Sequence, residues 1–379
     1  MSASQKGYYI CYGTITEFAG VHKKIDNQVK ALDSVCDCRK IVVPREERNV
    51  IKSIMWRMPF GSFGRKYEYA FDQIQQNGEP DFLYIRFVFL DRKFIGFLKE
   101  LRERYASAKV LLEIPTYPYK GELLHNITMF PFYFKDLFYR GRLKRYIDRI
   151  VTHSDDRRIY GIPTIRIRNG IIVDDISMVG DGAESEDRGI NLIAVARMQR
   201  AHGYERCIQG LAEYYRKNPS RKVKIHFVGE GAEKDYYQSL VSKGCLKDYI
   251  FFYGSKSGKD LDQIYNKADI GLGCFGLYKN KANTISSLKS VEYLAKGLPV
   301  ISGCVEDVMK RKDGEKFFKI FPNDESVIDM EEVVNFYDSI YQNGRNRDVI
   351  HEEIRDFARR TVDMSVVMKP IMEYIQKEK

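Results

Sequence analysis

The stretch NTISSLKSVEYLAKGLPVI, residues 283–301, decides how the second half of this chain folds. Ser286 and Ser287 are good helix caps, and the residues after them repeat apolar side chains with the period of a helix. Gly297 favours the end of that helix, and the apolar LPVI that follows predicts a buried strand. The stretch therefore predicts a helix and a strand of an α/β domain. The predicted buried face of the helix consists of Leu288, Val291 and Ala295.

Two charged residues, Lys289 and Glu292, stand in the first turns of this helix. Ligands of α/β sheets bind beyond the carboxyl ends of the strands, where helices begin, so the free N–H groups of Ser286, Ser287 and Leu288 indicate an anion site. The Lys289 ammonium adds a full charge for a phosphate, and the Glu292 carboxylate can accept hydrogen bonds from two neighbouring ribose hydroxyls. The alternative is an ordinary ion pair between Lys289 and Glu292 on a solvated face.

Strands and amphipathic helices alternate on both sides of this stretch. Apolar strands of this length between helices predict parallel sheets that are covered on both faces. The predicted fold class is α/β, with two Rossmann-like domains that face a cleft. In the second half, strands are predicted at 191–197, 223–229, 249–255 and 269–275, and helices at 204–219, 233–244 and 260–268. In the first half, strands are predicted at 7–13, 40–44, 81–90, 109–116 and 148–154, and helices at 21–33 and 94–105.

The length of 379 residues also favours two domains, because it exceeds the usual size of a single core. The glycine-rich, acidic segment 179–189 predicts a linker between an N-terminal domain at 1–178 and a C-terminal domain at 190–349. Residues 350–379 predict a helical tail that packs back on one of the domains.

The composition excludes several classes of protein. A hydrophobic fraction of 44% and a charged fraction of 30% are typical of a globular chain. The chain has no apolar run long enough for a membrane span, and its first residues lack the apolar core of a secretory signal, which predicts a cytoplasmic protein. The seven cysteines lack paired metal-ligand spacing, so no metal is expected. The formal net charge of +10 suits a phosphorylated substrate or an anionic membrane, and without a nucleic-acid-binding motif no nucleic acid partner is expected.

Several motifs resemble, in their order and spacing, the GT-B glycosyltransferases of family 4. The resemblance covers most of the chain. It implies transfer of a sugar from a nucleotide diphosphate sugar, of the UDP or GDP type, with retention at the anomeric carbon and with no metal or other cofactor. The motifs are SLKSVEYLAKGLPVI (287–301), NLIAVARMQRAHGYERCIQGLAEY (191–214), HFVGEGAEKDYYQSLV (226–241), FAGVHKKIDNQVKAL (18–32) and VTHSDDRRIYGIPTIRIRNGI (151–171).

The resemblance also implies roles for single residues of the donor site. Glu292 would bind the ribose of the nucleotide sugar, and Arg197 and Lys289 would hold its diphosphate. The family has two paired glutamates, and Thr284 stands in the place of the first. Thr284 and the N–H groups at the start of the helix would therefore have to approach the transferred sugar.

A second departure from the family is His202, which precedes Gly203 where the family has a lysine. A neutral His202 imidazole could donate one hydrogen bond there, a nearby phosphate could favour its protonation, or Arg200 could supply the positive charge instead. Weaker contacts with the donor are expected at Gly229, Gly254, Ser255 and, in the first half, Gly20.

The first half carries features expected of an acceptor side. Glu113, Thr116 and Tyr117 end a predicted strand and are expected to face the cleft. Residues 130–149 and residues 51–66 mix aromatic and basic side chains, the latter around the only tryptophan, which favours contact with an anionic membrane. The alternative is that these rings belong to the core. Because many relatives build surface polysaccharides on lipid-diphosphate carriers, the resemblance implies a lipid-linked saccharide acceptor, a part in polysaccharide or capsule synthesis, and a peripheral location on the inner face of the cell membrane.

Two other classes of function remain open at this point. A nucleotide-sugar epimerase on the same scaffold would convert nucleotide sugars without an acceptor. A catalytically silent nucleotide-sugar binding protein, which Thr284 and His202 make conceivable, would bind donors without turnover.

Overall fold

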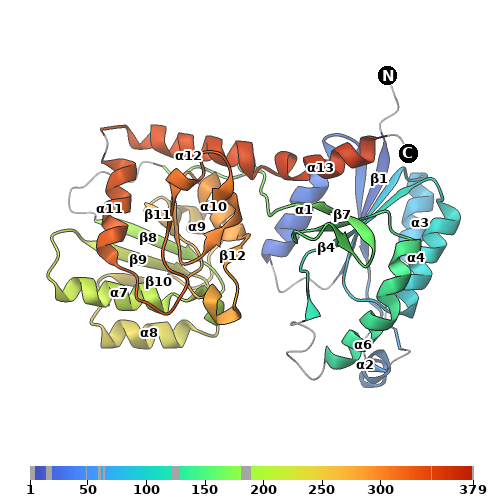
Figure 1. The fold of residues 1–379 in the computed structure, drawn as a ribbon, viewed down its shortest axis with the longest axis horizontal. Coiled ribbons are helices and arrows are strands. Elements are labelled where there is room, and N and C mark those ends of the chain that lie inside the picture. Colours follow the sequence, from blue (N-terminus) through green and yellow to red (C-terminus); the bar gives the residue numbers. More distant parts are fainter. Residues whose placement is uncertain are drawn as a thin grey trace. The chain divides into compact units, whose positions relative to one another are not determined.

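The computed structural model describes residues 5–13, 19–47, 49–58, 61–62, 65–120, 129–180, 189–342 and 344–377. The chain forms two compact units (Figure 1). Each unit contains a largely parallel sheet covered by helices, which confirms the predicted α/β class with two Rossmann-like domains. The first unit consists of Met1–Arg168 and Val367–Lys379, and the second of Asn169–Val366.

The first unit is built on a seven-stranded sheet of order β2-β1-β3-β4-β5-β7-β6, in which β6 pairs antiparallel with β7 and the other neighbours pair in parallel. Its strands are β1 (Lys6–Tyr12), β2 (Asp37–Val43), β3 (Phe82–Arg86), β4 (Lys109–Ile114), β5 (Arg149–Thr152), β6 (Arg158–Ile159) and β7 (Ile162–Arg166). Its helices include α1 (Ala19–Asp33), α2 (Val50–Arg57), α3 (Glu68–Asn77), α4 (Arg92–Arg104), α6 (Phe130–Tyr139) and the 3-10 helix η2 (Arg140–Arg145).

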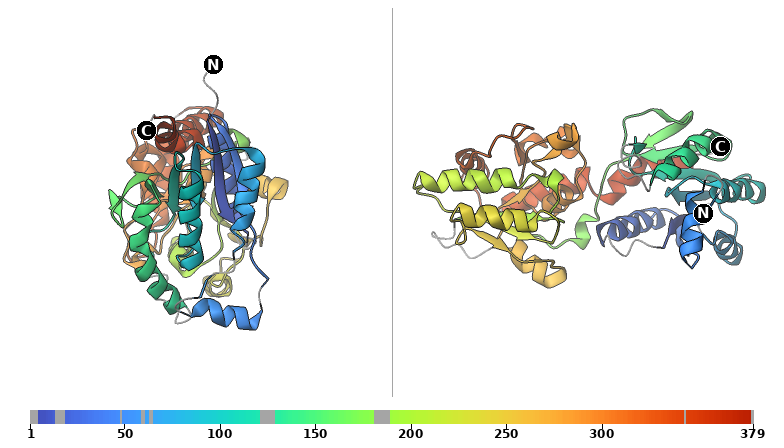
Figure 2. Two further views of the ribbon diagram at one scale, coloured as in Figure 1. Left: turned by 90° about the vertical axis from the view of Figure 1, so that its right-hand side faces the viewer. Right: turned by 90° about the horizontal axis from the view of Figure 1, so that it is seen from below.

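Helices α2 and α6 lie together at one end of the first unit (Figure 2). Lys135 of α6 joins them, because its ammonium donates to the carbonyls of Trp56, at the end of α2, and of Gly61, the latter at 2.7 Å. The Lys135 side chain is buried, so these carbonyls replace the water that its charge has lost.

The predicted strand at 81–90 is shorter in the structure. β3 ends at Arg86, which pairs with Glu113 of β4, and Asp91 then caps α4 with its side chain. The chain must leave the sheet between these two points. The apolar segment Phe87–Leu90 therefore forms a loop at the carboxyl edge of the sheet.

The second unit has a six-stranded parallel sheet of order β10-β9-β8-β11-β13-β15, with a small separate pair β12-β14. Leu192 and Ala194 of β8 pack in one apolar core and Ile193 in another, so both faces of the sheet are covered. Its strands are β8 (Ile190–Val195), β9 (Val223–Val228), β10 (Ile250–Phe252), β11 (Ile270–Leu272), β12 (Thr284–Ile285), β13 (Val300–Ser302), β14 (Val305–Glu306) and β15 (Phe318–Ile320). Its helices include α7 (Glu205–Arg216), α8 (Lys234–Lys243), α9 (Gly258–Tyr265), α10 (Leu288–Ala295), α11 (Met330–Tyr341) and α12 (Arg347–Thr361).

The boundary between the units differs from the predicted one, because it falls after Arg168 and not at 178. The segment that follows packs in the second unit, where four of its apolar side chains are buried beside α10 and α12. Residues 181–188 of the predicted linker lie outside the described residues. The four buried side chains are Ile171, Val173, Ile176 and Val179.

The C-terminal tail contributes to both units, whereas the sequence predicted packing on one. α12 belongs to the second unit, and α13 (Met364–Gln376) joins the first from Val367 onward. Lys109 of β4 is buried and donates to the carbonyls of Tyr374 and Ile375 at 3.1 and 2.7 Å. These carbonyls lie at the end of α13, where a helix has unpaired acceptors, so the ammonium and the helix end satisfy each other.

Candidate functional site

The strand order of the second unit fixes where a ligand can bind. β8 and β11 are neighbours, but the order of the strands reverses between them, which makes their carboxyl ends a topological switch point. Arg197, His202 and Gly203 follow β8, and the Phe275 N–H of the loop after β11 donates to the His202 carbonyl at 2.7 Å. Gly203 has φ of +65°, and a Cβ there would lie 2.4 Å from the backbone nitrogen of Gly276. Glycine therefore allows the two loops to meet.

Helix α10 begins beside this point with the cap that the sequence predicts. The Ser287 side chain accepts the Ser290 N–H, and Lys289 follows in the first turn. The Lys289 ammonium donates to the Gly273 carbonyl at 2.5 Å, at the end of β11, and to the Tyr204 hydroxyl at 2.9 Å. Loss of hydration lowers the pKa of Lys289, and the nearby acidic groups Cys274 and Glu306 partly offset this effect. The Lys289 nitrogen is thus held where the loops after β8 and β11 meet.

Glu292 lies one turn further along α10 and is half-buried. Its carboxylate accepts a hydrogen bond from the Tyr265 hydroxyl at 3.3 Å. Within the described residues, Lys289 and Glu292 form no ion pair with each other, since each hydrogen-bonds to other groups. The alternative of a surface ion pair is therefore wrong, and the two side chains remain separate groups.

The sequence of this unit matches a known protein family. Residues 189–334 match the family model described as glycosyl transferases group 1. These residues form a group 1 glycosyltransferase domain. No curated protein sequence matches the chain.

Solved structures extend the comparison to both units. The chain is similar to the lipopolysaccharide outer core galactosyltransferase WaaB in its apo form, with a TM-score of 0.58, 14% identity, and coverage of 97% of this chain and 99% of that one. It is similar to the sucrose-phosphate synthase of Thermosynechococcus elongatus, with a TM-score of 0.63, 13% identity, and coverage of 98% and 99%. For Anabaena HepE in complex with UDP and glucose, the TM-score is 0.59 with 12% identity and coverage of 98% and 99%. The fold is therefore that of the GT-B glycosyltransferases.

His202 in the glycosyltransferase domain has a lowered pKa, which favours the neutral imidazole among the forms that the sequence left open. Its Nδ1 atom accepts the Gln199 N–H at 3.2 Å, and its ring stacks on Tyr204 with 5.4 Å between centroids. Burial and then the nearby Lys289 charge lower the pKa of His202 to about 3, against a hydrogen bond to the Arg197 backbone that raises it. The ring thus orders the loop after β8. Arg200, whose side chain is exposed, remains as the candidate for the second positive charge.

The residues before α10 are placed by two different elements. Thr284 is exposed in β12, which pairs with β14 so that Thr284 lies opposite Val305. Ser286 is held by Asn169, which donates from its side chain to the Ser286 carbonyl at 2.8 Å. Leu288 is exposed at the first position of the helix, so the prediction that it belongs to the buried face is wrong. Ser287 and Ser290 on either side of it are buried, so the face of the first turn that carries Leu288 is the exposed one.

The glycine loops after β9 and β10 are tied to the same edge. The Gly229 N–H donates to the Gly254 carbonyl at 2.8 Å, and a Cβ on Gly229 would lie 2.1 Å from the Ala196 carbonyl oxygen. The Gly229 position therefore permits close packing against the loop that holds Arg197. Ser255 is exposed next to Gly254.

The remaining residues expected to contact the donor divide between the units. Arg197 is exposed two residues beyond β8. Gly20 lies near the start of α1 in the first unit, and its surroundings fall outside the described residues. Contacts of these residues with a donor stay predictions.

Glu306 is a site-adjacent residue that the sequence did not indicate. It is fully buried under α10, and its Oε1 atom accepts from the Ser290 hydroxyl at 2.9 Å. Its Oε2 atom has no hydrogen-bond partner among the described residues. Burial raises the pKa of Glu306 to about 8, despite the lowering effects of Ser290 and Lys289. In the sequence, the run VED is indistinguishable from a polar loop, so no signal predicted this burial.

Glu113, which the sequence predicted at a strand end facing the cleft, lies inside the first unit. It is fully buried, and it accepts hydrogen bonds from Tyr9 at 3.1 Å, Tyr84 at 3.0 Å and Arg86 at 3.0 Å. The Lys24 ammonium of α1 lies 3.5 Å away. Burial alone raises the pKa of Glu113, but Arg86, Lys24 and weaker partners outweigh it and hold the pKa at about 2. This carboxylate is therefore a charged anchor between the sheet and α1.

Metal sites and membrane spans are both absent from the part of the chain that the structure describes. No group of three or more His, Cys, Asp or Glu side chains in the described ranges is arranged to hold a metal ion. No helix in the same ranges is long and apolar enough to cross a membrane.

Proposed function

We propose that this protein transfers a sugar from a nucleotide diphosphate sugar to a saccharide acceptor, with retention at the anomeric carbon. The observation that carries the proposal is the capped start of α10, with Lys289 held at the switch point of a group 1 glycosyltransferase domain. Helix N–H groups and a nearby ammonium suit a diphosphate. Anabaena HepE, which has the same fold, binds UDP in its crystal structure, and this supports a UDP-type donor over a GDP-type donor.

In the proposed reaction, the bond between the anomeric carbon and the diphosphate oxygen breaks, and its electron pair leaves with the nucleoside diphosphate. An acceptor hydroxyl oxygen forms the new bond to that carbon, and its proton passes to the departing diphosphate oxygen. Lys289, Arg197 and the N–H groups of α10 stabilise the charge of the leaving group. Glu292 orients the nucleotide through its ribose.

The acceptor in this proposal is a lipid-linked saccharide of surface polysaccharide synthesis, used at the inner face of the cell membrane. The exposed aromatic and basic side chains of α6 and η2 support it, since such surfaces favour anionic membranes.

A thermal-shift panel of nucleotide sugars tests the donor assignment, because a ligand that binds the native state raises its unfolding temperature. We expect one UDP-sugar to raise the temperature in the wild type and to do so more weakly in Glu292→Gln. Conversion of that sugar without an acceptor would instead establish an epimerase. If the protein binds the UDP-sugar but releases no UDP with any saccharide acceptor tested, it is a silent binding protein.

A further inference from the structure

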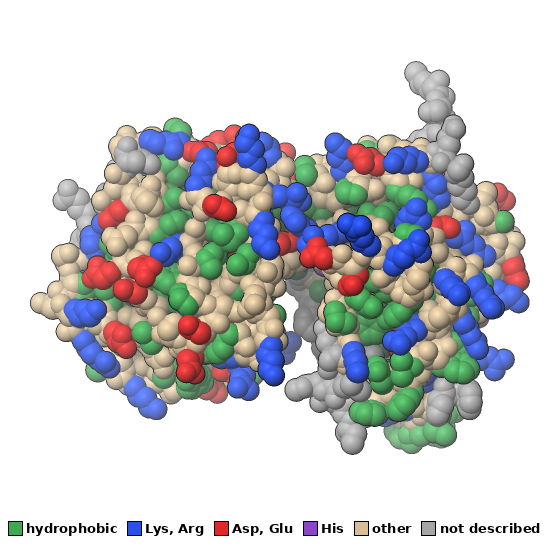
Figure 3. Space-filling view, in the orientation of Figure 1, with side chains coloured by type: hydrophobic (Ala, Val, Ile, Leu, Met, Phe, Trp, Pro, Cys, Tyr) green, Lys and Arg blue, Asp and Glu red, His purple; other side chains and the backbone are tan. Residues whose placement is uncertain are grey.

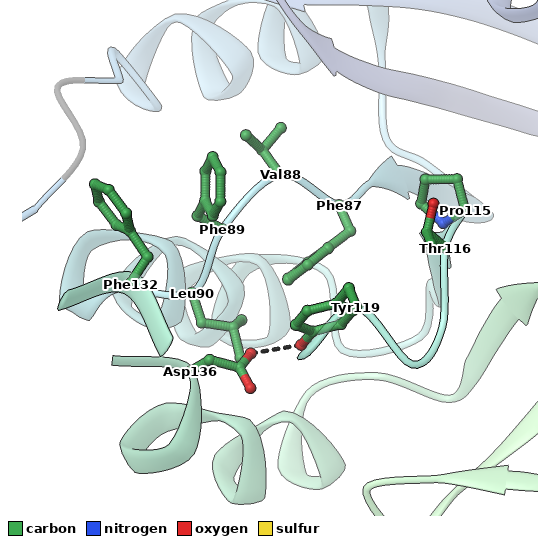
Figure 4. Close-up of a pocket in the computed structure, with 9 residues that line it drawn as sticks. All are labelled: Phe87, Val88, Phe89, Leu90, Pro115, Thr116, Tyr119, Phe132 and Asp136. Atoms are coloured by element: carbon green, nitrogen blue, oxygen red, sulfur yellow. Dashed lines mark hydrogen bonds between the residues drawn. The ribbon is translucent and has the colours of Figure 1, made fainter. Parts of the chain in front are cut away.

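The first unit contains an apolar pocket at the carboxyl edge of its sheet (Figure 4). Three segments line it: the loop after β3, the loop after β4, and α6. Its empty volume is about 560 Å³, a figure that includes the open solvent at its mouth. The lining residues are Phe87, Val88, Phe89, Leu90, Pro115, Thr116, Tyr119, Phe132 and Asp136.

The wall of the pocket is aromatic. Phe89 and Phe132 have ring centroids 5.3 Å apart, and Phe87 and Tyr119 have centroids 5.5 Å apart. The Asp136 carboxylate is buried at one end of the pocket and accepts a hydrogen bond from the Tyr119 hydroxyl. Because its carboxylate is already paired, the free surface of the pocket suits a chain of carbon atoms.

The pocket adjoins an exposed apolar surface on α2 and α6, which we call the α2–α6 face. Phe132 of α6 points into the pocket, while Phe134 and Phe138 of the same helix are more than half exposed. Figure 3 shows hydrophobic side chains gathered at this end of the unit. Contiguous exposed apolar surface of this kind marks a site of interaction. The side chains more than half exposed are Val50, Ile51, Ile54, Met55, Met58, Phe134 and Phe138.

The accessible charges that α2, α6 and η2 carry have one sign. Asp136 is the acidic residue of α2, α6 and η2, and it is buried. The accessible charges of these segments are therefore positive, which favours a partner that is both apolar and anionic. Trp56, which the sequence placed at the membrane, is buried under Arg45 and takes no part. The positive residues are Lys52, Arg57, Arg140, Arg142, Lys144 and Arg145.

We propose that the pocket holds the apolar chain of an anionic lipid while the α2–α6 face rests on the bilayer that supplies it. The inference rests on the proposed function for its biological meaning, since this lipid would carry the acceptor saccharide. Aromatic walls take the chain, and Arg140 and Arg142 at the end of α6 take the phosphate.

Two binding assays separate the pocket from the face. Farnesyl phosphate, kept below its micelle concentration, probes the pocket by calorimetric titration, with farnesol and inorganic phosphate as comparisons. Vesicles of phosphatidylcholine with and without phosphatidylglycerol probe the face by sedimentation. We expect farnesyl phosphate to bind at least tenfold more tightly than farnesol or phosphate, and anionic vesicles to bind in preference to neutral ones with a loss at high salt.

Variants of the pocket and variants of the α2–α6 face should weaken the binding of different ligands. Val88→Trp fills the pocket and should weaken farnesyl phosphate at least tenfold while vesicle binding changes less than threefold. Phe89→Ser serves the same purpose if Val88→Trp does not fold. The pair Phe134→Ser and Phe138→Ser should weaken vesicle binding at least tenfold and spare farnesyl phosphate. Tyr236→Ser, an exposed ring of α8, is the matched control and should change neither.

The proposal fails if farnesyl phosphate binds no better than farnesol and phosphate, if both pocket variants bind it like the wild type, or if neutral vesicles bind as well as anionic ones. The donor shift in the thermal assay is measured on the same variants. Lipid binding without any donor shift would overturn the proposed function alone, and a donor shift without lipid binding would overturn this inference alone.

Discussion

Replacing Glu113 with glutamine tests whether a buried charge anchors α1 to the sheet of the first unit. The pKa of Glu113 is about 2, compared with 4.5 for a free glutamate. At 1.36 kcal/mol per pH unit, this difference gives about 3 kcal/mol of stability at neutral pH. Because the folded pKa is the lower one, that stability is present above about pH 4.5 and is lost as the pH falls toward 2. Glu113→Gln should therefore lower the free energy of unfolding by about 3 kcal/mol, or the melting temperature by roughly 6–12 °C for a unit of this size.

Hydrogen exchange followed by mass spectrometry locates this loss within the chain. Protection should fall in β1, β3 and β4 and stay unchanged in β8, β9 and β11. Glu100→Gln is the matched control, since it removes an exposed pair with Arg104 and should cost less than about 1 kcal/mol. At pH 3.5 the effect of Glu113→Gln should be about 1 kcal/mol smaller than at pH 7. Equal losses in the two variants, or a loss that does not shrink at low pH, would refute the anchoring role.

Three further predictions concern the glycosyltransferase domain. Lys289→Met keeps the stem that lies near the Tyr204 ring but removes the charge, so kcat/KM should fall about ten- to a hundredfold. Tyr204→Phe should lower kcat/KM by less, and equal losses in the two variants would show that Lys289 only orders the loop. Because the pKa of His202 is about 3, His202→Gln should leave the shape of the kcat/KM profile between pH 5 and 8 unchanged, and a wild-type step near pH 6.5 that the variant lacks would contradict this. The pKa of Glu306 is raised to about 8, so its contribution to stability is present below about pH 4.5 and is lost as the pH rises through 8. Denaturant unfolding of Glu306→Gln should accordingly lose less stability from pH 6 to pH 9 than the wild type, and parallel losses would contradict a raised pKa.

The sequence was sufficient for features that depend on neighbouring residues. The apolar period and the serine cap predicted α10, and Gly297 predicted its end, because helix period and capping are set within a few residues. The alternation of strands and helices predicted the parallel sheets for the same reason. The family resemblance then indicated the donor edge, and residues 189–334 match a glycosyltransferase family.

Only the tertiary structure decided which partners each buried charge has and where the apolar loops pack, because those partners lie far apart along the chain. Burial and then Lys289, from a different element, lower the pKa of His202, and Arg86 and Lys24 keep Glu113 charged although it is buried. The apolar segment Phe87–Leu90 has the composition of a strand, but the pairing of β3 ends and α4 begins around it, so its side chains line a pocket. Local sequence determines which conformations a segment favours, and only the packed fold determines which of its side chains lose water and which neighbours replace that water.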